Sequence, residues 1–156
     1  MDNKERALSA ALRYIGFKMR TEKETGQYLV KKGFSEEVIQ ETLETLRDYR
    51  YLDDQEFAGY WVRDRFRYSG HGRYRIIGDL RKKGIHKGIL DAAIQNFISE
   101  EEEEAKILEL YRKKNPDNLP MTEKELYRLY QFFLRRGFPD EKIRKILLRN
   151  HPDCDS

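Results

Sequence analysis

One phrase occurs three times in this chain and constrains its fold more than any other feature of the sequence. Two cations precede a glycine, with apolar residues on both sides, in LVKKGF (residues 29–34), LRKKGI (80–85) and FLRRGF (133–138). Glycine adopts a left-handed conformation just past a helix end at little cost, and the residue after it then packs on the residue four positions before the glycine. Cations in the last turn oppose the negative end of the helix dipole. The phrase therefore predicts three helix ends.

The spacing of the phrase predicts a repeat. Gly33, Gly84 and Gly137 are 51 and 53 residues apart, a longer period than the roughly 34 residues of tetratricopeptide repeats or the roughly 40 to 47 of HEAT and armadillo repeats. After each glycine, apolar residues return at helical spacing. They are Val38, Ile39, Thr42, Leu43 and Leu46, then Ile89, Leu90, Ala93, Ile94 and Phe97, then Ile143, Ile146 and Leu147. Each phrase is thus predicted to be a turn between two helices.

Two further patterns predict where the other helices begin. TEKE occurs at residues 21–24 and again at 122–125, and a threonine followed three positions later by glutamate is a capping box. One more helix precedes each of these starts in the repeat. Its apolar positions are Leu8, Ala11, Leu12, Ile15 and Met19 in the first repeat, Phe57, Ala58, Trp61 and Val62 after a cap at Asp53 to Glu56 in the second, and Ala105, Leu108 and Tyr111 in the third.

The sequence therefore predicts an all-α protein, an elongated array of tandem three-helix repeats. The expected repeats are residues 1–51, a basic repeat at 52–98, and 99–156 including the polar tail HPDCDS. Hydrophobic and charged residues each make up 38% of the chain, which suits three small cores better than one thick core.

Enzymatic and metal chemistry find no support in the sequence. The single cysteine, Cys154, lies in the polar tail, and the three histidines are scattered without metal-ligand spacing. Neither a phosphate loop nor a nucleophile elbow is present; Gly70-His71-Gly72 before a helix could seat a phosphate, but a flexible loop explains it better. We expect no enzyme, cofactor, metal or membrane span, and a cytoplasmic location, since no stretch approaches 18 apolar residues.

Charge is unevenly distributed along the chain. Between Trp61 and Lys83 there are eight Lys or Arg against two Asp, whereas residues 100–104 are five glutamates that suit the acidic start of a helix. On the helix that follows Asp53, Tyr60, Arg63 and Arg67 lie opposite the apolar side. An aromatic among arginines suits phosphate and base contacts, although a merely solvated face explains the pattern at least as well.

Several short segments resemble the successive signatures of the RecX family. They are Ala7-Leu8 with Arg13-Tyr14 and Arg20-Thr21-xx-Glu24; Leu29-xx-Lys32-Gly33; Tyr51-Leu52-Asp53-Asp54-xx-Phe57-Ala58; and Gly72-xx-Arg75-Ile76-xxx-Leu80-xx-Lys83-Gly84-Ile85. The resemblance covers about residues 7–97, and its most specific part joins residues 51–58 to residues 72–85.

The resemblance implies a regulator that binds the RecA recombinase and its filament on single-stranded DNA and inhibits recombinase and coprotease activity, without catalysis of its own. The repeat and the capping boxes lead us to expect an elongated monomer. Capping of filament ends and disruption of the interior both remain open, as does direct binding to DNA. The residues expected to meet the filament or nucleic acid are Tyr60, Arg63, Arg67, Arg73, Arg75, Lys82 and Lys83. Two alternatives are a stand-alone nucleic-acid-binding protein that uses this surface, and a helical protein-interaction scaffold.

Overall fold

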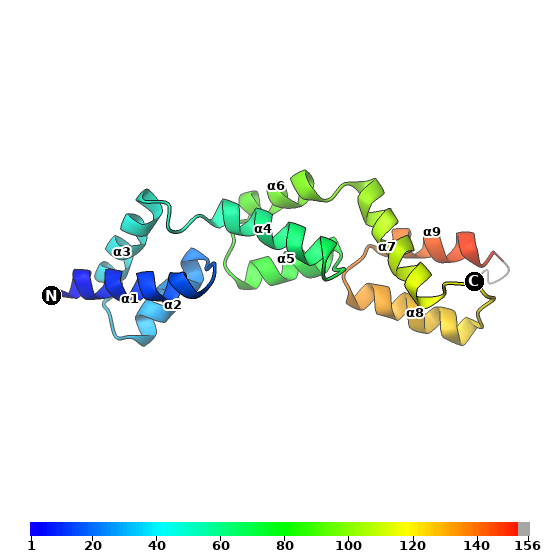
Figure 1. Cartoon of the computed structure of the whole chain (residues 1–156), viewed down its shortest axis with the longest axis horizontal. Helices are drawn as coiled ribbons and strands as arrows, with labels where there is room; N and C mark the ends of the chain where they lie inside the picture. Colours follow the sequence, from blue (N-terminus) through cyan, green and yellow to red (C-terminus); the bar gives the residue numbers. More distant parts are fainter. Residues whose placement is uncertain (153–156) are drawn as a thin grey trace. The chain divides into compact units, whose positions relative to one another are not determined.

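The computed structural model describes residues 1–152, so Cys154 and the end of the polar tail lie outside the described part of the chain. Nine α-helices and no strand are present in this part (Figure 1). They are α1 Asn3–Phe17, α2 Glu22–Lys31, α3 Glu36–Asp48, α4 Asp54–Arg67, α5 Arg73–Lys82, α6 Lys87–Phe97, α7 Glu100–Lys114, α8 Glu123–Arg135 and α9 Asp140–Asn150. The predicted all-α class with three helices per repeat is confirmed.

The three glycine phrases form the predicted helix ends. Gly33, Gly84 and Gly137 have φ angles of 90°, 83° and 91°. In each turn the amide of the residue after the glycine donates to the carbonyl five positions earlier, from Phe34 to Leu29, from Ile85 to Leu80 and from Phe138 to Phe133, at 3.0–3.2 Å. This bond pattern closes a helix with a left-handed residue, so the phrase is explained by helix termination.

Both predicted capping boxes are formed. Thr21 accepts a hydrogen bond from the amide of Glu24, whose carboxylate accepts from the amide of Thr21. Thr122 and Glu125 make the same reciprocal pair at the start of α8. These local bonds satisfy amides that a helix leaves without partners in its first turn, and they explain why α2 and α8 begin where TEKE begins.

The described chain divides into two compact units, which we describe separately. Unit 1 comprises residues 1–60 and 80–91. Its core lies between α1, α2 and α3, where Ala7, Ala11, Leu29 and Leu46 are fully buried, and Ala10, Ile39, Leu43 and Leu52 complete it. Small alanines face α2 and α3 from α1, so the three helices approach closely.

Unit 2 comprises residues 61–79 and 92 onward. The core between α7, α8 and α9 is larger in side-chain volume than that of unit 1, with two fully buried phenylalanines and a buried tyrosine. Its members are Ile107, Tyr111, Leu129, Phe133, Phe138, Ile143, Ile146 and Leu147. The Tyr111 hydroxyl lies within hydrogen-bond distance, 2.6 Å, of a ring nitrogen of the buried His151, and it also donates to the side-chain oxygen of Asn118. The hydrogen-bonding capacity of this buried hydroxyl is therefore satisfied.

Three predicted core positions are wrong. Leu12 and Met19 are each 39% exposed, and Met19 lies beyond the end of α1. Ala105 is exposed, and the helix instead buries Glu103, Ile107 and Tyr111. In α7 the buried Glu103 interrupts the apolar pattern that locates a buried face, and in α1 the buried positions are the small residues Ala7, Ala10 and Ala11.

Candidate interaction surface

Unit 1 holds three of the residues predicted to form the binding surface. Tyr60 is half exposed at 51%, and Lys82 is exposed with its backbone carbonyl 3.4 Å from the Lys23 ammonium. Lys83 is partly buried, and its ammonium lies 3.3 Å from the carboxylate of Glu24. Although burial raises the pKa of Glu24, the Thr21 amide and Lys83 hold it below its ordinary value. Lys83 is therefore engaged inside unit 1.

In unit 2, α4 presents two arginines at i and i+4 on one face. Arg63 and Arg67 are both exposed. The Arg63 guanidinium lies 4.8 Å from the ring centre of Phe97, and the carbonyl of Arg67 accepts a hydrogen bond from Lys106 at 3.1 Å. Because both residues are exposed, their side chains lie at the surface of unit 2, where an anion could reach the guanidinium groups.

The two arginines at the start of α5 differ in their surroundings. Arg75 is exposed. Arg73 is held by Glu103, whose carboxylate accepts from its Nε at 2.8 Å and from its backbone amide at 3.1 Å. Its guanidinium also lies 3.6 Å from Glu100. Arg73 thus already has carboxylate partners within unit 2, in contrast to Arg75.

The partner of Arg73 belongs to a buried ion cluster that sequence reasoning missed. Glu103 has no exposed side-chain surface, and the Lys142 ammonium of α9 lies 2.9 Å from the same carboxylate and 2.6 Å from Glu100. Burial lowers the pKa of Lys142, but hydrogen bonds to Glu100 and Glu103 raise it above its ordinary value. The glutamate run does start α7, as predicted, and one member of it is a core residue.

Two amides of the Gly70-His71-Gly72 loop are engaged within unit 2. The amide of His71 donates to the carbonyl of Arg65 at 3.0 Å, and that of Gly72 donates to the carbonyl of Arg136 at 2.7 Å. His71 is 8% exposed, and burial together with the nearby Arg75 and Arg136 lowers its pKa. The loop is part of the packing of unit 2.

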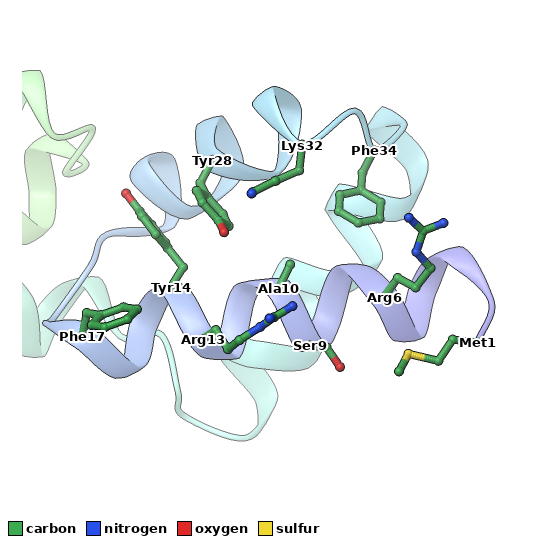
Figure 2. A pocket seen from close by; sticks show the side chains of 10 residues that line it. All are labelled: Met1, Arg6, Ser9, Ala10, Arg13, Tyr14, Phe17, Tyr28, Lys32 and Phe34. Carbon is green, nitrogen blue, oxygen red and sulfur yellow. The ribbon is translucent and has the colours of Figure 1, made fainter.

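A groove of about 630 Å³ lies between α1 and α2 of unit 1 (Figure 2). Tyr14 of α1 and Tyr28 of α2 stack face to face at one side of it, with ring centres 4.1 Å apart and ring planes 8° from parallel. The guanidinium of Arg20 lies 4.0 Å from the ring centre of Tyr14. Lys32 extends toward the Tyr28 ring, 5.4 Å from its centre. Aromatic faces and cations therefore meet in one place.

The groove also exposes large apolar surface next to further cations. Phe17 is 85% exposed at the end of α1, and Phe34 lines the opposite end. Arg6 and Arg13 add positive charge from α1. The sequence contained a signal for this groove in the adjacent pair Arg13-Tyr14, but only the packing of α1 against α2 brings Tyr28 and Lys32 to it.

Neither a membrane-spanning helix nor a group of three possible metal ligands is found among residues 1–152. No helix there combines the length and apolar character that a bilayer requires. His, Cys, Asp and Glu side chains do not gather in threes at metal-binding distances in that range.

Three successive family models match the chain. They describe the first, second and third three-helix domains of RecX and match residues 7–46, 53–94 and 100–147. A regulatory protein RecX from a Geobacillus strain is 33% identical over 148 residues, which cover 94% of this chain and 54% of that protein. The chain thus spans about half the length of this relative. A regulatory protein RecX from Prosthecochloris aestuarii is 32% identical, and the match covers 91% of this chain and 91% of that protein.

Solved structures share the fold. The crystal structure of RecX from Lactobacillus salivarius matches 94% of this chain and 96% of its own with a TM-score of 0.83 at 26% sequence identity. A second crystal structure, of a regulatory protein RecX, matches with a TM-score of 0.78. Because three consecutive RecX domain models match most of its length in order, the chain belongs to the RecX family of regulatory proteins.

Proposed function

We propose that this protein binds the RecA recombinase and its filament on single-stranded DNA, in the cytoplasm, and restrains recombinase and coprotease activity. The observation that carries the proposal is the match of all three RecX domains, in order, along one chain. The relatives are named as regulatory proteins, which agrees with a role in binding rather than catalysis. Small repeated helical cores with much surface per residue also suit a protein that lies along a larger assembly.

The residues that we assign to filament contact are the exposed members of the basic set. Arg63, Arg67 and Arg75 in unit 2, with Tyr60 and Lys82 in unit 1, project side chains that carboxylates or phosphates can approach. Arg73 and Lys83 are paired with Glu103 and Glu24, each within its own unit, and we give them a secondary role. An exposed ion pair is weak in water, so binding to a dense array of acidic groups must draw on several cations together.

The mechanism follows from differential binding. A ligand that bridges neighbouring subunits blocks addition of the next subunit at a filament end, and one that binds a deformed filament more tightly favours disassembly. Both outcomes lower the amount of active filament. They differ in stoichiometry, because capping needs one molecule for each filament end, whereas disruption needs many along the interior.

A titration into RecA that hydrolyses ATP on single-stranded DNA tests this proposal. We expect substoichiometric protein to slow ATP hydrolysis and strand exchange, with RecA from the same source as the partner. Electron microscopy of the same mixtures separates fewer or shorter filaments from intact filaments that carry bound protein. Unchanged hydrolysis and unchanged filament length at saturating protein would contradict the proposal.

A second candidate function, direct binding of single-stranded nucleic acid, is favoured by the groove between α1 and α2. Bases stack on aromatic side chains, and cations beside the rings attract the phosphates. Exposed Phe17 and the cations Arg13 and Lys32 supply both features. Fluorescence anisotropy with a labelled oligonucleotide, without RecA, distinguishes the two functions. Tight binding that falls steeply with salt and is lost in Phe17→Ala would favour the second candidate, and no binding would exclude it.

A further inference from the structure

One contact inside unit 1 joins the first repeat to the residues that end α5. The Thr21 hydroxyl, at the start of α2, donates to the carbonyl of Lys83 at 2.8 Å, and the Lys83 ammonium lies 3.3 Å from the Glu24 carboxylate. The Lys23 side chain covers Gly84 so closely that an added Cβ there would lie 2.6 Å from the Lys23 Cβ. The capping box TEKE (residues 21–24) therefore also packs on the turn at residues 82–84. We call the capping box the docking element and the Lys-Lys-Gly turn its receptor.

A backbone contact accompanies this docking, and it recurs in unit 2. The amide of Glu22, the first residue of α2, donates to the Asp54 carboxylate in the first turn of α4 at 3.1 Å. In the same way, the amide of Arg73, the first residue of α5, donates to Glu103 in the first turn of α7 at 3.1 Å. The N-terminus of the second helix in one repeat thus contacts an acidic side chain in the first helix of the next repeat.

The third repeat presents a second copy of the docking element. Residues 122–125 repeat the sequence TEKE of residues 21–24 and are all exposed. Thr21 is fully buried and its hydroxyl donates to Lys83, whereas the Thr122 hydroxyl donates to its own Glu125 at 3.0 Å. The two boxes share sequence and local geometry and differ in that the first is seated on a receptor.

The first repeat presents a second copy of the receptor. Lys31, Lys32 and Gly33 stand 51 positions before Lys82, Lys83 and Gly84, and all three are exposed. A Cβ added at Gly33 would meet no other atom within 4 Å, in contrast to the covered Gly84. Asn3 stands 51 positions before Asp54, at the equivalent place in the first turn of α1, and its side-chain oxygen accepts hydrogen bonds as a carboxylate does.

We propose that two copies of this chain associate head to tail, with the first turn of α8 in one copy docked on the end of α2 in the other. The partner is a second copy because this chain carries both halves of a contact that it already makes internally, with the same register. Each contact seen in unit 1 has a chemical counterpart across the interface. These are the Thr122 hydroxyl to the Lys32 carbonyl, Lys32 to the Glu125 carboxylate, Lys124 over Gly33, and the Glu123 amide to the Asn3 side chain.

The symmetry of this contact has a consequence for assembly. The two surfaces are different, so the interface is heterologous and each added copy offers a new receptor to the next. The contact consists of a few residues at two helix ends, and an interface of this small size is weak between free molecules. If the proposed function holds, copies placed side by side on a filament would gain affinity from this contact and bind cooperatively. The self-association itself does not depend on RecA or DNA.

Charge reversal across the pair Lys32 and Glu125 tests the proposal on the protein alone. Sedimentation at increasing concentration should show self-association of the unaltered protein, and Lys32→Glu or Glu125→Lys should each abolish it by placing like charges together. A mixture of the two variants should recover association, because the unaltered Glu125 of the first variant then meets the unaltered Lys32 of the second. Recovery cannot arise from a folding defect in either variant. Lys18→Glu and Glu101→Lys, exposed positions outside the contact, serve as controls that should leave association unchanged.

Cross-linking identifies the contact directly. A carbodiimide joins a lysine to a carboxylate at ion-pair distance, and mixing ¹⁴N-labelled with ¹⁵N-labelled protein shows whether Lys32 and Glu125 come from different copies. Mixed-isotope peptides that join the two residues support the proposal. Their absence while other intermolecular cross-links form, their occurrence only within one copy, or self-association that survives both single reversals would each overturn it. Because RecA is absent from these experiments, their result is separable from that of the proposed function.

Discussion

The amide of Gly72 donates to the carbonyl of Arg136 at 2.7 Å, and the backbones of Gly72 and Gly137 touch. A Cβ added at Gly72 would lie 2.6 Å from the carbonyl carbon and oxygen of Gly137, both backbone atoms. Gly137 is itself held at a φ of 91° by its role as a helix end. Two glycines 65 residues apart therefore form one close contact in unit 2.

Gly72→Ala should destabilise unit 2, because neither backbone can move away from the added methyl without breaking helix-end hydrogen bonds. Overpacking of this kind costs about 1 to 3 kcal/mol. Gly78→Ala in α5 is the matched control, since a Cβ there meets nothing within 4 Å, and alanine in a helix interior should stabilise by about 0.5 to 1 kcal/mol. Urea unfolding of both variants measures the difference. Equal stabilities would mean that the contact is loose in solution.

Glu103→Ala should be among the most destabilising single substitutions in unit 2. The substitution leaves Arg73 and the largely buried Lys142 without the carboxylate that both contact. Removing one partner of a buried ion pair destabilises a protein by about 3 to 5 kcal/mol. Glu102→Ala, one position earlier and exposed, should change stability by less than about 0.5 kcal/mol. Thermal unfolding monitored by circular dichroism compares them, and similar melting temperatures would show that the cluster does not stabilise the fold.

Stability should fall as the pH decreases through the ordinary pKa of histidine, about 6.5. Burial, Arg75, Arg136 and Arg65 lower the pKa of His71 against a smaller opposing effect of Asp79. A histidine with a lowered pKa in the folded state binds its proton more readily when unfolded, so acidification below pH 6.5 favours unfolding until its folded pKa is passed.

Replacement of His71 measures how much this side chain contributes to the pH dependence of stability. In His71→Gln, the loss of unfolding free energy between about pH 7 and pH 5.5 should be smaller than in the unaltered chain. Denaturant unfolding at several pH values measures the slope. A slope unaffected by His71→Gln would show that this side chain does not contribute.

Arg50→Gly should stabilise unit 1. Arg50 follows α3 with a φ of 61°, and the amide of Tyr51 donates to the carbonyl of Leu46 at 2.8 Å, the same closing bond that follows the three glycines. An L-residue in this conformation is strained by about 1 to 2 kcal/mol, and glycine removes the strain while making the unfolded chain more flexible. The expected net gain is about 0.5 to 1 kcal/mol in urea unfolding. A loss of stability would indicate that the arginine side chain makes a compensating contact.

Reversal of Arg63 and Arg67 together to glutamate should abolish inhibition of RecA under the proposed function. Both side chains are exposed on one face of α4, so the stability of unit 2 should change little, apart from the contact of Arg63 with Phe97. Arg128→Glu with Arg135→Glu, two exposed positions on α8, is the matched control. Filament binding at two salt concentrations separates the outcomes. Equal losses of filament binding for both double variants would indicate nonspecific charge attraction. Full inhibition of RecA by the α4 variant would exclude this face of α4 as the filament contact.

The local sequence determined the helix ends and starts of this protein. Gly33, Gly84 and Gly137 occupy left-handed positions, and both TEKE boxes cap helices, because these conformations depend on bonds between residues fewer than six positions apart. The repeat could also be predicted, since its period is visible in the spacing of those local signals. Leu12, beside a buried face made of alanines, and Ala105, beside the buried Glu103, could not be placed correctly by periodicity alone.

Only the tertiary structure decided which charged residues are available for binding. Arg73 and Arg75 look equivalent in sequence, yet Glu103, 30 residues away, holds the first, and the second is exposed. Likewise, only the docking of Thr21 on Lys83, 62 residues away, showed that a capping box can also serve as a contact element. Long-range burial changes the availability of a side chain through desolvation and pairing, and neither effect leaves a mark in the neighbouring sequence.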